Sequence, residues 1–144
     1  MFKNFRSPSN WYLAAFILIV VEVVVVSLVS LGMLVAGIVV VGSGHGNAWA
    51  GLIGVMLLVF GGIGVLLSGL LWYLVVALGH GSQIARWIFG ILAGLNLVVG
   101  IPSLLFTSGA SIFSVAWHGV IFYGLLLDPQ VRAAFGDQPL SSWL

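Results

Sequence analysis

The sequence has no cysteine and very few charged residues. Only 5% of its 144 residues are Asp, Glu, Lys or Arg, against about 25% in a typical soluble domain, and 62% are hydrophobic. Without cysteine there is no disulfide and no thiolate metal site. The four Lys and Arg exclude a basic nucleic-acid-binding surface, and the apolar content excludes a disordered chain. The composition is typical of a polytopic membrane protein, whose first partner is the lipid bilayer.

Four apolar runs are long enough to cross a bilayer, which takes about 20 helical residues. Clusters of Gly, Ser, His and Asn separate these runs and are typical of turns. An isolated strand would leave its backbone groups unsatisfied in lipid, so we expect each run to form a helix. The sequence predicts an all-α protein with one domain, residues 1–144, built as an antiparallel bundle of four transmembrane helices. The expected spans are residues 11–41, 48–78, 84–106 and 110–127.

The positive charges predict the orientation of the four spans. Lys3 and Arg6 precede the first span, Arg86 begins the third, and Arg132 follows the fourth. In a chain of four spans these positions face the same side, and the two opposite loops contain no Lys or Arg. Because Lys and Arg concentrate in cytoplasmic loops, we expect both termini to be cytoplasmic.

A short helix is expected after the last span. Asp128 is a favourable N-cap, and Pro129 suits the first helical position. Gly136 would end this helix, so we expect it over residues 129–135, lying at the lipid headgroups. A frayed tail is the alternative.

Small residues recur on the predicted spans at the spacing of one helix face. Such faces let membrane helices approach closely, and we interpret them as packing surfaces within the bundle, with an oligomer contact as the alternative. The small pairs are Gly90 with Gly94, Gly32 with Ala36, and Gly64 with Ser68.

Each predicted span also has one polar side chain about 14–16 Å from its cytoplasmic end, counted at 1.5 Å per residue. These residues are Glu22, Ser68, Asn96 and His118. One hypothesis is structural, with hydrogen bonds between helices that fix their register. The other is functional: Glu22 and His118 exchange protons and couple them to a transported solute.

The other histidines and the motifs of the sequence favour no enzyme. His45 and His80 lie in Gly-His-Gly loops on opposite sides of the predicted bundle, so they cannot share a metal ion. The sequence contains no nucleophile with its base, no phosphate-binding loop and no zinc signature. We therefore expect no catalysis, metal or cofactor. A pigment- or haem-associated subunit with His118 as axial ligand is a weaker alternative.

The segments GSQIARW (81–87) and LDPQVRAAF (127–135) resemble small four-span bacterial inner-membrane proteins of uncharacterised function. The resemblance covers the second half of the chain and implies a location in a bacterial inner (plasma) membrane. Our leading hypothesis is a non-catalytic integral membrane protein. It would act as an accessory or scaffold subunit of a membrane complex or as a homo-oligomer. A small proton-coupled transporter or channel that uses Glu22 and His118 is the alternative.

Overall fold

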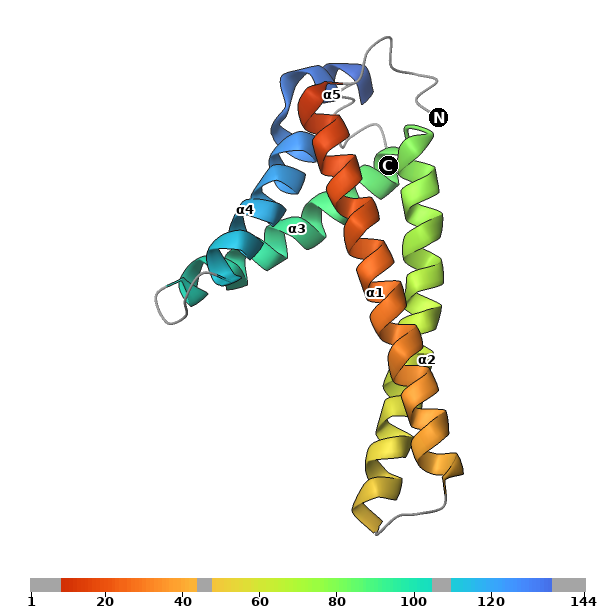
Figure 1. Ribbon diagram of the computed structural model, residues 1–144. Helices are drawn as coiled ribbons and strands as arrows, with labels where there is room; N and C mark the ends of the chain where they lie inside the picture. Colours follow the sequence, from red (N-terminus) through yellow and green to blue (C-terminus); the bar gives the residue numbers. More distant parts are fainter. Residues whose placement is uncertain (1–8, 44–47, 105–109, 136–144) are drawn as a thin grey trace, which may run out of the picture. The chain divides into compact units, whose positions relative to one another are not determined.

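The computed structural model describes residues 9–43, 48–104 and 110–135 of the chain. These residues form helices and no strand, so the prediction of an all-α protein is confirmed. Three helices are long and apolar enough to cross a membrane, and four if the bent pair Ser111–Leu127 and Pro129–Phe135 counts as one span. The elements are α1 (Asn10–Gly42), α2 (Ala48–Gly79), α3 (Gln83–Ser103), α4 (Ala110–Phe122), the π-helical turn η1 (Tyr123–Leu127) and α5 (Pro129–Phe135) (Figure 1).

The helix bounds lie close to the expected spans. α1 and α2 begin and end within a residue of the expected positions, and α5 has the expected bounds. α3 ends at Ser103, whereas its span was expected to reach residue 106, which lies outside the described residues. Lys3, Arg6, His45 and Gly136 also lie outside them.

Local hydrogen bonds explain the turn between α2 and α3. Gly81 has a φ of 84°, a left-handed conformation that favours glycine. The N–H groups of Gly81 and Ser82 bond to the carbonyls of Leu78 and Ala77, which is the Schellman pattern that ends helices. The Ser82 hydroxyl then accepts a hydrogen bond from the N–H of Ala85, so one turn ends α2 and caps α3.

The chain divides into two compact units. We call Met1–Ile19 together with Val75–Leu144 the terminal unit, and Val20–Leu74 the hairpin unit. α1 and α2 contribute residues to both. Each unit has its own helix packing and is described by itself.

In the hairpin unit, α1 and α2 run side by side in opposite directions (Figure 1). Their buried residues recur every seven positions, which is the spacing of left-handed coiled-coil packing. Most of these residues are small. They are Val23, Ser30 and Gly37 on α1, and Gly54, Gly61 and Ser68 on α2.

The glycines bring the two hairpin helices into backbone contact. A Cβ atom built on Gly61 would lie 2.5 Å from the backbone nitrogen of Leu34, and one built on Gly37 would lie 2.7 Å from that of Leu58. Membrane helices associate through such close van der Waals contact, because lipid gives them little hydrophobic drive. The hairpin contact therefore depends on the missing side chains.

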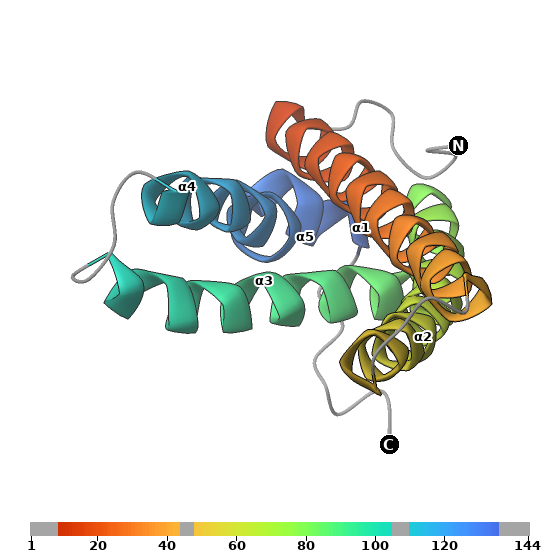
Figure 2. The same ribbon diagram turned by 60° about the horizontal axis from the view of Figure 1, so that its bottom comes forward.

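In the terminal unit, α3 lies beside α4 and η1 in the opposite direction, as Figure 2 shows. A Cβ on Gly90 would lie 2.6 Å from Leu126, and one on Gly94 would lie 3.1 Å from Phe122. Gly124 in η1 lies against the start of α1, where a Cβ on this glycine would come within 2.5 Å of the carbonyl oxygen of Trp11. Small residues thus form close contacts in this unit as well.

Two adjacent glycines of α2 test the hairpin contact. We expect Gly61→Ala to lower the free energy of unfolding by about 1–3 kcal/mol, because its Cβ would overlap the α1 backbone. Gly62→Ala is the control, because a Cβ there meets no atom within 4 Å and alanine favours the helix by about 0.5–1 kcal/mol. Thermal or denaturant unfolding in detergent measures both. Equal free energies of unfolding for the two variants would contradict a close contact between Gly61 and the α1 backbone.

Candidate functional site

The four polar residues expected at mid-depth are divided between the units. Glu22 and Ser68 belong to the hairpin unit, and Asn96 and His118 belong to the terminal unit. The structure therefore relates these residues only in pairs, and each pair is compared along its own two helices.

The contacts between α1 and α2 give the register of the hairpin. Gly61 lies opposite Leu34, and Gly54 lies opposite Val41. In an antiparallel pair, each residue earlier on α1 lies opposite one residue later on α2. This register therefore places Glu22 opposite Tyr73. Ser68 is then five residues away from the level of Glu22, or about 7.5 Å along the helix axis. Glu22 and Ser68 thus do not share a level.

Asn96 and His118 lie closer in level. The contacts of Gly90 with Leu126 and of Gly94 with Phe122 place them within about two residues, or about 3 Å, along α3 and α4. Asn96 is exposed and donates to the carbonyl of Leu92 at 3.0 Å. His118 is half-buried, and its Nδ1 donates to the carbonyl of Ser114 at 2.8 Å.

Five polar side chains within the helices share this kind of bond. Each donates to a backbone carbonyl three or four residues earlier in its own helix, so its hydrogen bond requires neither water nor another helix. In an apolar environment this bond removes most of the free-energy cost of burying the polar group. The residues are Ser27, Ser68, Asn96, Ser103 and His118.

The small residues expected to pack helices differ in their surroundings. Gly64 lies against Ser30, Gly90 against Leu126 and Gly94 against Phe122. Gly32 and Ala36, in contrast, are exposed, and a Cβ on Gly32 would meet no atom within 4 Å. The face of α1 that packs on α2 contains Ser30, Leu34 and Gly37 instead.

A group of polar side chains in the terminal unit connects the start of α1, the end of α2, the start of α3 and α5. We call this group the polar junction. It consists of Ser9, Tyr12, Gln83, Arg86, Asp128 and Phe135, the last through its ring and its carbonyl.

Asp128 is the centre of the polar junction. It is buried, with 3% of its surface exposed, yet all its polar groups are bonded. One carboxylate oxygen accepts from the Ser9 hydroxyl, and the other accepts from the N–H of Gln130 at 2.9 Å. Its own N–H bonds to Tyr123, and its carbonyl accepts from Arg132. A buried carboxylate is stable only with such complete bonding.

Ser9 and Tyr12 connect α1 to this carboxylate and to α2. The Ser9 hydroxyl accepts from the N–H of Tyr12 at 3.0 Å, which is the bond of a helix N-cap. The Tyr12 hydroxyl donates to the carbonyl of Leu78 at 2.9 Å. Since the last carbonyls of a helix have no partner within it, Tyr12 satisfies one at the end of α2.

Arg86 and Gln83 hold the last residue of α5. The guanidinium of Arg86 lies 4.9 Å from the centre of the Phe135 ring, a distance typical of a cation–π contact. Gln83 donates through its side-chain amide to the Phe135 carbonyl. Arg86 is buried, with 4% exposed, so α5 is anchored to α3 at its end as it is to α1 at its start.

This arrangement is suited to holding helices together. Its carboxylate, hydroxyls and guanidinium make contacts to neighbouring segments of the chain. Among residues 9–43, 48–104 and 110–135, no three His, Asp or Glu side chains gather as they would around a metal ion. The contacts of the polar junction thus join four segments of the chain.

Sequence reasoning found only part of the polar junction. The prediction that Asp128 caps α5 is confirmed by its bond to Gln130. The bond from Ser9, the bond from Tyr12 and the burial of Arg86 were missed. Ser9 carried a signal, because a serine directly before an apolar helix is a favoured N-cap.

Comparison of the chain with protein-family models, curated proteins and solved structures found no match. The resemblance to small bacterial membrane proteins stays a prediction. The function is therefore inferred from the geometry of the chain itself.

Asp128→Ala tests the polar junction. We expect it to lower the free energy of unfolding by about 1–2 kcal/mol and to speed hydrogen exchange of the amides in α5, because the helix loses its cap and its bond to Ser9. Gln130→Ala is the control, because its exposed side chain makes no bond to Asp128. Equal exchange in the two variants would refute an anchoring role.

Proposed function

We propose that this chain is a non-catalytic integral membrane protein, either an accessory or scaffold subunit of a membrane complex or a homo-oligomer. It crosses a bacterial inner membrane four times as an antiparallel bundle, with both termini in the cytoplasm. α5 lies on the cytoplasmic side. Each part of this proposal has separate support.

The polar junction supports the four-span topology. It joins the start of α1, the end of α2, the start of α3 and α5, which are the positions that four antiparallel spans would bring to one side. Arg86 and Arg132 both lie in these segments. Since Lys and Arg favour the cytoplasmic side, the junction is best interpreted as the cytoplasmic end.

The bonding of the polar side chains supports a non-catalytic role, and it is the observation on which the proposal chiefly depends. Ser68, Asn96 and His118 each bond to the carbonyl four residues earlier in their own helix. A solute or proton pathway needs polar groups that are directed to the solute or to water. Groups satisfied by their own helix are suited to lipid instead.

The exposed faces of the hairpin support association with a protein. Only 11% of the most apolar window of α2 is buried. Lipid can cover most of such a surface, but the exposed small residues Gly32 and Ala36 also leave the backbone of α1 open. Small exposed residues are the usual contact between membrane helices, so these faces suit a partner subunit or a second copy.

Native mass spectrometry tests the association. We expect the chain, purified in mild detergent from cells that express it at natural abundance, to carry a partner in fixed stoichiometry or to form one defined oligomer. A second purification at high salt would retain the complex, because apolar contacts are not screened. A monodisperse monomer in both preparations would contradict the proposal.

Proton flux tests the transporter alternative. We expect liposomes containing the protein to acidify no faster than protein-free liposomes when a pH gradient and a clamped membrane potential are imposed. Glu22→Gln, which removes the carboxylate, should give the same trace. A flux that is present with the natural chain and absent with Glu22→Gln would overturn the non-catalytic role in favour of proton coupling.

A further inference from the structure

The level of Glu22 along the hairpin can be read from its neighbours on α2. The contacts of Gly61 with Leu34 and of Gly54 with Val41 place Glu22 opposite Tyr73, beside Trp72. Tyr73 is 69% exposed and Trp72 is 39% exposed. The acidic residue of the hairpin thus lies at the same level as two exposed aromatic residues, both of the type that prefers the membrane interface.

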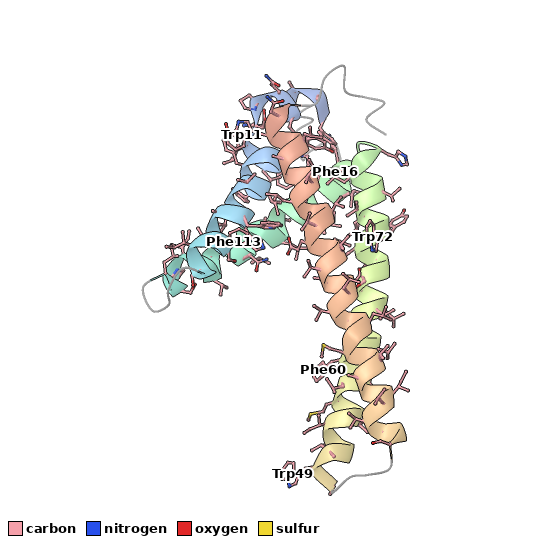
Figure 3. The ribbon with its side chains drawn as sticks, viewed as in Figure 1. Trp11, Phe16, Trp49, Phe60, Trp72 and Phe113 are labelled. Carbon is pink, nitrogen blue, oxygen red and sulfur yellow. The ribbon has the colours of Figure 1, made fainter. Side chains whose placement is uncertain are left out.

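A third aromatic residue, Trp49, marks the opposite end. Trp49 lies near the start of α2 and is 71% exposed (Figure 3). Trp49 and Trp72 are 23 residues apart along one helix, or about 35 Å. The hydrocarbon core of a bilayer is about 30 Å thick, and the headgroups extend it to about 40–45 Å. The two tryptophans are therefore spaced as interfacial residues would be.

The residues between these levels are suited to lipid. Val23–Gly42 of α1 contains no charged residue, Trp or Tyr, and its 20 residues extend about 30 Å. Residues 50–71 of α2 contain none either, and extend about 33 Å. Both stretches match the thickness of the hydrocarbon core, and Glu22 is the residue immediately before the first of them.

The side chain of Trp72 fits this level. Its indole N–H donates to the Ser27 hydroxyl at 3.2 Å, and that hydroxyl donates to the carbonyl of Val23 at 2.7 Å. The polar edge of the ring is thereby satisfied across the hairpin, while much of its apolar face is exposed. An amphipathic ring at the boundary of the hydrocarbon would be held in this way.

We infer that the lipid headgroups contact the hairpin at Glu22, Trp72 and Tyr73 on one side and at Trp49 on the other. Glu22 then lies in the hydrated headgroup layer and not at mid-depth, and its carboxylate remains close to water. The hairpin needs neither a strong tilt nor a projecting tip, because the stretches between these residues already match the bilayer. This inference depends on the membrane location proposed above.

Spin labels on single cysteines test the depth, since the chain has no cysteine of its own. Val25, Val29, Val35 and Val39 of α1 are all exposed and suit labelling. In dioleoylphosphatidylcholine vesicles, collision rates with oxygen and with a nickel chelate give the depth of each label. We expect Val29 and Val35 to be deepest and Val25 and Val39 to be shallower by similar amounts, because the centre of Val23–Gly42 lies between Gly32 and Met33.

The alternative is a membrane centred on the whole of α1, near Val26. In that case Val25 and Val29 would be the deepest labels and Val39 would be the shallowest, and this profile would overturn the inference alone. If the nickel chelate reached all four labels as freely as it reaches water, the membrane location itself would fail. The two failures are thus distinguishable.

A pair of lysine substitutions gives an independent readout. We expect Glu22→Lys to insert in membranes as well as the natural chain, and Leu31→Lys to reduce the inserted amount several-fold, because Leu31 lies next to the proposed centre. Leu31 is 51% exposed, so its loss removes little packing. If the membrane centre were near Val26, both positions would be about equally deep and both substitutions would reduce insertion alike, which would contradict the inference.

Discussion

A lipid bilayer supplies no hydrogen-bond partner to the helices inside it, and this constraint explains where the polar groups of this chain lie. Ser68 and Asn96 satisfy themselves within one turn of their own helix. Asp128 and Arg86 cannot be satisfied in that way, because a carboxylate and a guanidinium need several partners. Both lie where several helix ends meet: Asp128 accepts from Ser9 and Gln130 there, and the guanidinium of Arg86 lies against the Phe135 ring. Polar chemistry is thus gathered at the polar junction, and the long helices remain compatible with lipid.

The same solvent determines how the helices pack. In water, burial of apolar side chains would hold them together, but lipid reduces that advantage to almost nothing. Close contact between backbones takes its place, and it needs residues without side chains. Gly61 against Leu34 in the hairpin unit and Gly90 against Leu126 in the terminal unit show the same arrangement in two separate places. Glycine thus lies where two helices approach most closely, as at Gly37, Gly61 and Gly124.

Local features were predictable from the sequence, and long-range ones were not. The cap of α5 by Asp128 depends on neighbouring residues, so capping rules were sufficient. The bond from Ser9 to the same carboxylate joins residues 119 positions apart, and no local pattern encodes it. The packing face of α1 was also missed. Gly32 and Gly37 lie on different faces of α1, and only the position of α2 shows that the face with Gly37 is the one that packs.

Counting depth from the ends of an apolar run failed to separate the level of Glu22 from that of Ser68. One face of the first turns of α1 packs against protein, as the burial of Tyr12, Phe16 and Ile19 shows.

The central claim is that lipid is the solvent of these helices, and extraction of membranes with alkaline carbonate tests it most directly. This treatment opens vesicles and releases soluble and peripheral proteins, whereas spanning helices stay in the bilayer. The account predicts that the whole chain sediments with the carbonate-washed membranes and enters solution only with detergent. Recovery of the chain in the carbonate supernatant, without aggregation, would contradict it.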